Sequence, residues 1–484
     1  MRHDSPLQSY TLQSILGHYQ LQPPSVGEAA HLTGVDKRVF EALRDQQLLA
    51  EFILPKIDDM KEALDRETWI ASILSTMEVT GFAFKPQYFE ELAQLVSQRI
   101  HDINNEANRL LQRNINLASH SQVSAALFTD LKLEVPGLRD HNKTHTSTRD
   151  EVLQRLRDSH PMPNLVLRHR HLSKLLSTWL TPLVAQAHPD HLLRTSGVAI
   201  YPQWANATAT GRLSSNSPNV QAAPKIVTDT DSKGQTMEIN VREAFVARDG
   251  HMLIACDYSQ MEIRVLAHVS GDPQLISLLQ KAGGNGDVFQ MMVEWMETSG
   301  GTRFKRDHMK RTCYGIIYGQ SSKGLSETLN VPIDDAKELI EKFLGFFPAV
   351  KKFIEEVKSK ALGEGHVQML SGRKRYLPGI KSAVDHERAR AERQAVNTII
   401  QGSAADIIKM AMVELSRPTR DEVMSKARLL AQLHDELIFE AEKEHVDKVA
   451  KLVVEVMTTV VELCVPLKVS QSRGPTWGTL KKIT

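Results

Sequence analysis

The twelve residues from Leu429 to Glu440 place three ionisable side chains between two apolar runs. Their sequence, LLAQLHDELIFE, predicts two β-strands joined in a hairpin with Asp435 at the tip. Burying a charge is costly unless a partner or a cation compensates for it. We therefore expect His434, Asp435 and Glu436 either to lie at a solvated turn or to hold a cation.

A second acid, Asp257, follows the apolar run of HMLIACDYSQ, which predicts a buried strand that ends in polar residues. Neighbouring strands lie about 4.8 Å apart, so two such strand ends can bring Asp257 and Asp435 within reach of one pair of ions. Oxygen ligands suit Mg²⁺ or Mn²⁺, and the chain has no His/Cys spacing typical of zinc. Two unrelated acids at strand ends are also common, so these two segments alone leave both interpretations open.

Composition restricts the class of protein. The 484 residues suggest about three domains, and 41% hydrophobic and 24% charged residues are typical of a globular chain. A net charge of +1 lacks the basic excess of a simple nucleic-acid binder, although basic side chains cluster in RFKRDHMKR and SGRKRYLPGIK. We expect no membrane span, no secretory signal and, from three widely spaced cysteines, a reducing compartment without disulfides.

The order of patterns along the chain predicts an α+β fold. Helical spacing of apolar residues dominates from about residue 25 to 194, for example in YFEELAQLVSQRIHDINNEANRLL. A segment rich in Gly, Ser, Asn and Pro from about residue 195 predicts strands and loops; helices resume from 305 to 412, and strands return near the C-terminus. This order indicates a sheet domain with helical insertions.

Four side chains recur every four residues in RDHMKRTCYGIIYG: Arg306, Lys310, Tyr314 and Tyr318. On a helix they share one face, with two cations followed by two aromatic rings. Arg and Lys neutralise phosphates and aromatic rings stack on bases, so this face matches a ligand with a polyphosphate at one end and a base at the other. The alternative is a surface helix whose two tyrosines pack in the core.

Three segments, DYSQMEIRVLAHVSGD, RxxxKxxxYxxxYG and QLHDE, resemble motifs A, B and C of family A DNA polymerases and occur in the same order. TATGRLSSNSPNVQ, GRKRYLPGI and AERQAVNTIIQGSAADIIKMAM are similar to three further blocks of this family, and the likeness covers roughly residues 60–484. TCYGIIYG and DVFxxxxEW look closer to the eukaryotic DNA polymerases theta and nu than to bacterial polymerase I.

The resemblance implies a right-hand polymerase fold, an α+β architecture in which an antiparallel palm sheet carries a helical thumb and helical fingers. The implied ranges are 61–100, 195–270 and 425–484 for the palm, 101–194 for the thumb and 271–424 for the fingers. Residues 1–60 resemble the remnant of an inactive exonuclease-like domain whose acidic motifs are missing, so we expect no proofreading.

The reaction that the resemblance implies is phosphoryl transfer to a primer 3′-hydroxyl with two Mg²⁺ ions, for which Mn²⁺ can substitute. The catalytic residues would be Asp257, Asp435, Glu436 and Lys310, and Lys310 is the candidate acid for the leaving pyrophosphate. The metal ligands would be Asp257, Tyr258 and Asp435. Primer-template DNA and deoxynucleoside triphosphates are the implied partners, and other repair proteins are further candidates.

By the same resemblance, Arg306 and Lys310 would hold the incoming triphosphate, and Tyr314 would stack on the nucleotide. Glu262 would fill the space beside the sugar and exclude a 2′-hydroxyl, while Tyr318 would guard the template position. The nucleotide-binding set is Arg306, Lys310, Tyr314, Tyr318, Glu262 and Gln260. DNA contacts are implied for Arg212, Arg393, Asn397, Gln401, His434 and Lys174.

Several of these basic and acidic residues have an alternative interpretation. His434 could only orient the hairpin, Arg264 is expected to be a structural partner in the palm, and Asp287 could only cap the helix that follows it. The run from Arg373 to Arg375 could form a solvated loop or touch DNA. Tyr314 stands where many bacterial members have phenylalanine, and its hydroxyl predicts efficient use of dideoxynucleotides.

The predicted function is template-directed DNA synthesis without proofreading, in DNA repair or translesion synthesis. The enzyme would be nuclear if the likeness to theta and nu holds, and cytoplasmic otherwise. A bacterial or organellar type of polymerase I is the first alternative, and a non-catalytic DNA-binding module is a further one. A single-subunit RNA polymerase is disfavoured because Glu262 leaves no room for a 2′-hydroxyl.

Overall fold

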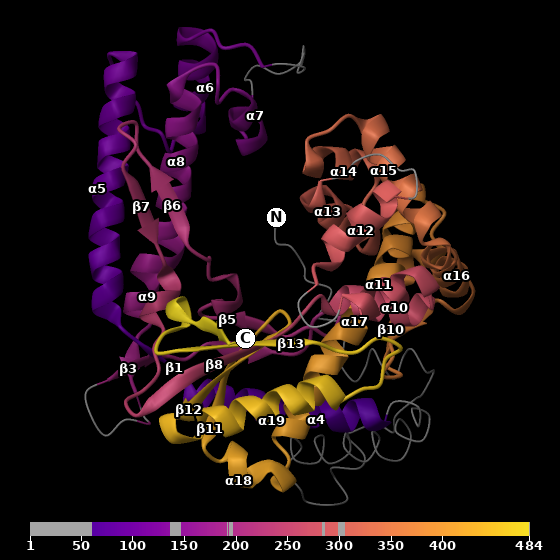
Figure 1. The fold of residues 1–484 in the computed structure, drawn as a ribbon. Coiled ribbons are helices and arrows are strands. Elements are labelled where there is room, and N and C mark those ends of the chain that lie inside the picture. Colours follow the sequence, from indigo (N-terminus) through magenta and orange to yellow (C-terminus); the bar gives the residue numbers. More distant parts are fainter. Residues whose placement is uncertain are drawn as a thin grey trace, which may run out of the picture.

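The computed structural model describes residues 61–135, 147–190, 192, 197–282, 286–298 and 305–483. The predicted exonuclease-like remnant, residues 1–60, lies outside the described residues. Figure 1 shows a sheet at the base, a helical arm on one side of it and a block of helices on the other. The predicted α+β class, with antiparallel strands and helical insertions, is confirmed.

The base is a five-stranded sheet in the order β11-β12-β8-β13-β14. Its strands are β8 (His251–Tyr258), β11 (Ala427–Leu433), β12 (Glu436–Glu442), β13 (Val469–Gly474) and β14 (Lys481–Ile483). The four successive buried residues from 253 to 256 show that both faces of the central strand β8 are covered, and α19 (Val446–Thr459) packs against it. The predicted hairpin is present as β11 and β12, whose pairing ends at Leu433 and Glu436.

In the residues that the structure describes, the arm consists of five helices and two π-helical turns. These are α5 (Pro86–Leu111), α6 (His120–Ser124), α7 (Asp150–Arg155), α8 (Pro161–Leu175) and α9 (Thr181–Ala185), with the π-turns at Ala125–Asp130 and Leu176–Leu180. α5 begins at a proline, whose fixed φ suits the first turn of a helix, and packs against α8 and α9. Because α5 runs without a break through residue 100, the expected boundary between palm and thumb falls inside one helix.

The hairpin of β6 (Val227–Thr230) and β7 (Thr236–Ile239) lies beside α5 and α8 (Figure 1), although the expected palm range includes its residues. Arg168 donates to both carboxylate oxygens of Asp229, at 2.7 and 2.8 Å. Arg99 lies 2.6 Å from a carboxylate oxygen of Asp231. These ion pairs attach the hairpin to the arm.

The helical block contains eight of the described helices and one short hairpin. The helices are α10 (Met261–Ser270), α11 (Pro273–Lys281), α12 (Val288–Thr298), α13 (Arg306–Ile317), α14 (Ser322–Leu329), α15 (Ile333–Phe346), α16 (Pro348–Glu364) and α17 (Asp385–Leu415), and the hairpin is β9 (His366–Gln368) with β10 (Lys374–Tyr376). At 31 residues, α17 is about 45 Å long. It packs against α10, α16 and α4 and so connects the block to the base.

The remaining elements surround the base sheet. They are α4 (Lys61–Thr80), β1 (Phe82–Phe84), β2 (His188–Pro189), β3 (Val198–Ile200), β4 (Gln203–Ala205), β5 (Ser214–Asn216) and α18 (Asp421–Met424). The buried ammonium of Lys409 on α17 lies 2.7 and 2.8 Å from the two carboxylate oxygens of Glu67, which holds α4 on α17. None of the helices that the structure describes combines the length and apolar character needed to span a bilayer.

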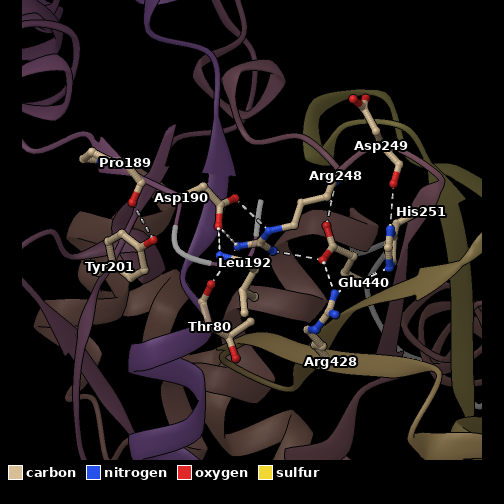
Figure 2. A network of polar contacts seen from close by, with 10 residues as sticks. All are labelled: Thr80, Pro189, Asp190, Leu192, Tyr201, Arg248, Asp249, His251, Arg428 and Glu440. Carbon is tan, nitrogen blue, oxygen red and sulfur yellow. Dashed lines mark hydrogen bonds and ion pairs between the residues drawn. The ribbon is translucent and has the colours of Figure 1, made fainter. Parts of the chain in front are cut away.

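Arg248 forms a buried junction between α4, the end of β2 and strand β12 (Figure 2). Its guanidinium donates to Asp190 Oδ2 at 2.7 Å, to Glu440 Oε2 at 2.9 Å and to the carbonyl oxygen of Thr80 at 2.7 Å. The side chain of Arg248 is 1% exposed, and those of Asp190 and Glu440 are 0% exposed. Arg428 also lies 3.4 Å from Glu440, but it is 41% exposed.

Candidate active site

Acids from two distant segments meet at one edge of the base sheet. Asp257 on β8 is paired directly with Glu436 on β12. The backbone N–H of Tyr258 donates to the carbonyl oxygen of Asp435 at 3.1 Å. His434 adopts a φ of 56°, in the left-handed region that tight turns use, between β11 and β12. The fold therefore brings Asp257, Asp435 and Glu436 together.

The surroundings of these acids favour their protonated forms. Burial raises the pKa of Asp435 to about 7, and repulsion from Glu262 and Asp257 adds to the rise. Burial and the charge of Asp257 raise the pKa of Glu436 to about 7 as well. Burial also raises the pKa of Asp257. Acids that destabilise one another in this way are stabilised by a cation among them.

The donor atoms fit Mg²⁺ or Mn²⁺, because hard cations prefer carboxylate oxygens. Within the described ranges, no three His, Cys, Asp or Glu side chains converge as a ready metal site. Two carboxylates are compatible with Mg²⁺, which usually keeps several waters and takes further oxygens from substrate phosphates. The Tyr258 hydroxyl donates to the carbonyl oxygen of Met457 at 2.6 Å, so its main-chain carbonyl is the atom of Tyr258 that can contact a metal.

Helix α13 presents the expected stripe of cations and rings. Arg306 and Lys310 are exposed, Tyr314 is half-buried, and Tyr318, just after the last helical residue, is 42% exposed. The centroid of the Tyr314 ring lies 6.0 Å from that of Tyr318 and 6.1 Å from that of Phe289. The exposure of Tyr318 contradicts the alternative in which both tyrosines are core residues.

Asp287 has two partners in the helical block. Its Oδ1 accepts hydrogen bonds from the N–H groups of Phe289 and Gln290, so it caps α12 as the structural interpretation predicts. Its other carboxylate oxygen forms an ion pair with Arg306. The first cation of the α13 stripe is therefore already neutralised by a carboxylate of the same chain.

Glu262 lies in the first turn of α10 and is 3% exposed. One carboxylate oxygen forms an ion pair with Arg212, and the other accepts a hydrogen bond from the Tyr318 hydroxyl at 2.9 Å. Burial and the charge of Glu262 raise the pKa of Tyr318 to about 12, so its hydroxyl remains a donor at neutral pH. Because Glu262 also repels Asp435, the end of α13 and the acids share one electrostatic environment.

Helix α17 carries three of the residues with an implied DNA contact, at four-residue spacing. The side chain of Arg393 packs on Gly319, where an added Cβ would lie 2.7 Å from its Cγ. The side-chain oxygen of Asn397 is buried and has no hydrogen-bond partner, a costly arrangement that a ligand donor would relieve. Gln401 contacts the hydroxyl of Tyr318. This face of α17 therefore lies beside Tyr318, whose hydroxyl donates to Glu262.

Of the three remaining residues of the expected set, Lys174 lies apart from the acids, whereas Gln260 and His434 lie close to Asp257 and Asp435 in the chain. Lys174 is exposed on α8, in the arm rather than at the sheet edge. Gln260 precedes α10 with a φ of 54°, a conformation uncommon outside glycine. The main-chain carbonyl of His434 accepts a hydrogen bond from the side chain of Gln432.

Three cations near the acids were not recognised in the sequence. Lys225 and Lys482 lower the pKa of Asp257 against the stronger effect of burial, and Arg242 does the same for Glu436. Arg242 lies over the Trp477 ring, 4.3 Å from its centroid. The three come from different segments and belong to no motif, so only the folded chain identifies them.

Arg264 is a structural residue, as the sequence indicated. It is 1% exposed and donates to the carbonyl oxygens of Ser259 at 2.8 Å and Pro466 at 2.7 Å. These bonds connect the turn after β8 to the segment before β13. Arg264 therefore holds the acid-bearing end of β8 in place.

The sequence matches a model of DNA polymerase family A over residues 86–479. The chain is similar to the thermostable DNA polymerase I of Thermus thermophilus, with 36% identity over 460 residues, which are 94% of this chain and 52% of that protein. It is also similar to the DNA polymerase I of Geobacillus stearothermophilus, with 38% identity over 410 residues, 84% of this chain and 45% of that protein. The chain spans about half the length of the curated relatives it matches.

The fold is similar to that of a solved structure, the POL domain of Pol1 from M. smegmatis in complex with DNA primer-template and dNTP. The TM-score is 0.79 at 30% sequence identity, and the match covers 97% of this chain and 79% of that one. With the family model and this structural match in agreement, the chain belongs to DNA polymerase family A.

Proposed function

We propose that this chain is a DNA-directed DNA polymerase that extends a primer 3′-hydroxyl with deoxynucleotides chosen by a template. The observation that carries the proposal is that the fold brings Asp257 and Asp435 together at the adjoining ends of strands β8 and β12. Asp435 lies close to Glu262, which accepts a hydrogen bond from Tyr318 at the end of helix α13. The similar M. smegmatis domain is described with DNA primer-template and dNTP, which supports the same partners here.

The acids would hold the metal. Asp257, Asp435 and the main-chain carbonyl of Tyr258 would bind two Mg²⁺ ions, or Mn²⁺, which when bound lower the pKa of the primer hydroxyl and neutralise the triphosphate. Glu436 lies opposite Asp257 and would be the next acid beside the metal. The neighbouring cations Lys225 and Arg242 partly offset the charge of Glu436.

Helix α13 would bind the incoming nucleotide. Arg306 would leave Asp287 and pair with the triphosphate, which offers more negative charge than one carboxylate. Lys310 lies one turn further on the same face and would donate a proton to the leaving pyrophosphate. Tyr314 would stack on the nucleotide from its place beside Phe289.

Glu262 would select the sugar. Its two carboxylate oxygens are held by Arg212 and Tyr318, so it cannot swing away from a 2′-hydroxyl without breaking both contacts. Asn397 and Gln401 would reach the minor groove, where acceptors are shared by all base pairs, and so test the shape of a pair without reading its sequence.

We also infer the identity of the subdomains and the biological role of the enzyme. The arm would be the thumb, the helical block the fingers and the base sheet the palm. The TCYGIIYG and DVFxxxxEW segments support a theta/nu-like enzyme of DNA repair or translesion synthesis, located in the nucleus and without proofreading. The identity with bacterial DNA polymerases I supports a second candidate, a gap-filling polymerase of that type. Extension opposite an abasic site, absent in the second case, separates the two.

A primer-extension assay tests the main proposal. The wild-type chain should extend a labelled primer on a template with Mg²⁺, and Asp257→Asn should reduce the rate by at least about 100-fold because a metal ligand is lost. Asp249→Asn is the matched control, because Asp249 precedes β8 at the end opposite the acids and should leave the rate unchanged. Unchanged synthesis by Asp257→Asn would exclude the metal assignment.

A further inference from the structure

Arg373 lies just before β10, in the basic run that sequence analysis left open between solvated loop and DNA contact. Its guanidinium contacts protein groups. Nε donates to Asp406 Oδ1 at 3.0 Å, and Nη2 donates to the carbonyl oxygen of Thr210 at 2.7 Å and to that of Gly402 at 3.4 Å. Asp406 is 1% exposed, and its other oxygen accepts a hydrogen bond from Ser371.

Two glycines make room for this guanidinium. A Cβ added at Gly211 would lie 2.4 to 2.8 Å from three guanidinium atoms of Arg373, and one at Gly402 would lie 3.3 Å from its Nη2. Gly211 also has a φ of +84°, which other residues rarely adopt. The guanidinium therefore fills the space between the loop at 208–212 and helix α17, and a larger residue at 211 would displace it.

The loop that Arg373 contacts leads directly to Arg212. Its turn is closed by the N–H of Gly211, which donates to the carbonyl oxygen of Thr208 at 3.0 Å. The Thr208 hydroxyl donates to the carbonyl oxygen of Arg212 at 2.7 Å. Both ends of the turn are fixed by these bonds. A contact that holds the Thr210 carbonyl therefore also fixes the backbone of Arg212, from which its side chain extends.

We propose that Arg373 is a positioning residue, which acts through the 208–212 loop to hold Arg212 on Glu262. This inference rests on the proposed function, because Arg212 and Glu262 are the groups expected at the primer-template and at the nucleotide sugar. Asp406 and Gly402 belong to α17, which also carries Gln401. Arg373 thus fixes the loop relative to the helix that borders the same site, a preorganisation on which reaction rates depend steeply.

Arg373→Lys tests the proposal, because lysine keeps the charge but cannot reach the loop and the helix together. The matched control is Arg375→Lys: Arg375 belongs to the same hairpin and donates to Thr398 Oγ1 on α17 at 2.5 Å. With correct dNTP, we expect Arg373→Lys to lower kcat/KM by about 10- to 100-fold, as misplaced groups do. The control should stay within about 2-fold.

DNA binding separates positioning from direct contact. A lost phosphate contact would weaken primer-template affinity and reduce its salt slope by about 1. Because lysine keeps the charge, the charge-removing variant Arg373→Gln makes this measurement, and we expect it to leave the affinity and the salt slope unchanged over a range of salt concentrations. In an Arg212→Ala background, Arg373→Lys should have little further effect on kcat/KM, because residues that act through one another are not additive. A reduced salt slope, or an undiminished effect in that background, overturns the proposal.

Amide hydrogen exchange measures how firmly the 208–212 loop is held, independently of catalytic activity. In Arg373→Lys the N–H of Gly211 should exchange at least about 10-fold faster than in the wild type, and in Arg375→Lys it should not. A wild type that fails to extend primers would refute the proposed polymerase function alone, whereas unchanged Gly211 exchange would overturn the role of Arg373.

Discussion

Replacing Arg248 by methionine should destabilise the protein severely, because Asp190 and Glu440 lose the buried cation that they share and Glu440 keeps only the exposed Arg428. In the wild type Asp190 and Glu440 are 0% exposed, and the guanidinium between them also satisfies the carbonyl oxygen of Thr80. Removing one partner of a buried ion pair costs about 3–5 kcal/mol. Each carboxylate keeps a backbone donor, Leu192 N–H for Asp190 and Arg248 N–H for Glu440, so we expect a loss within that range.

Arg428→Met is the matched control for this prediction. Arg428 contacts the same carboxylate of Glu440 at 3.4 Å but is 41% exposed, and exposed pairs contribute about 0–1 kcal/mol. Urea unfolding monitored by circular dichroism measures both variants, and their free energies of unfolding can be compared where the denaturant slope is unchanged. Burial, rather than the number of ion pairs, should decide the difference.

The deficit of each variant is its loss of unfolding free energy relative to the wild type. A deficit below about 1 kcal/mol at pH 8, or one equal to that of Arg428→Met, would refute the reasoning from burial.

Three further outcomes are expected. Tyr314→Phe should lower dideoxynucleotide use relative to deoxynucleotide use by about 10- to 100-fold in single-nucleotide extension, because a hydroxyl that replaces the missing 3′-hydroxyl contact is lost; an unchanged ratio would contradict this. Glu262→Ala should raise ribonucleotide incorporation relative to deoxynucleotides by at least about 10-fold, and continued exclusion would assign sugar selection elsewhere. Asp435 and Glu436 have folded pKa values of about 7, above their unfolded values of about 4, so the metal-free chain should lose stability as pH rises from 4 to 7; thermal melts with and without Mg²⁺ should show that Mg²⁺ restores it most at pH 7 and above.

Local patterns in the sequence predicted the parts of the site that lie on single elements. The hairpin around Asp435 follows from two apolar runs with polar residues between them, and the α13 stripe follows from four-residue spacing. The expected boundary between palm and thumb at residue 100 lies inside helix α5, which continues to Leu111. Periodicity shows that a helix exists but does not show which domain its ends belong to.

Apart from the meeting of Asp257 and Asp435, contacts between distant segments were beyond prediction. The partners of Arg248 and Arg373 lie far away along the chain, and no spacing rule connects a basic loop residue with a carboxylate or a carbonyl on another element. The same applies to Lys225 and Arg242, whose effect on the acids depends on where their segments pack. Such pairs depend on how distant segments pack in the folded chain, and no local pattern in a single sequence indicates that packing.

The ion pair between Arg306 and Asp287 has a consequence for ligand discrimination. In the free protein the guanidinium is occupied, so any anion that binds there must compete with a tethered carboxylate. Both side chains are substantially exposed, at 44% and 38%, so the competition is mild and a multiply charged phosphate chain wins it easily. A monovalent anion such as chloride gains little by the exchange. Arg306 should therefore bind a multiply charged ligand in preference to a monovalent anion.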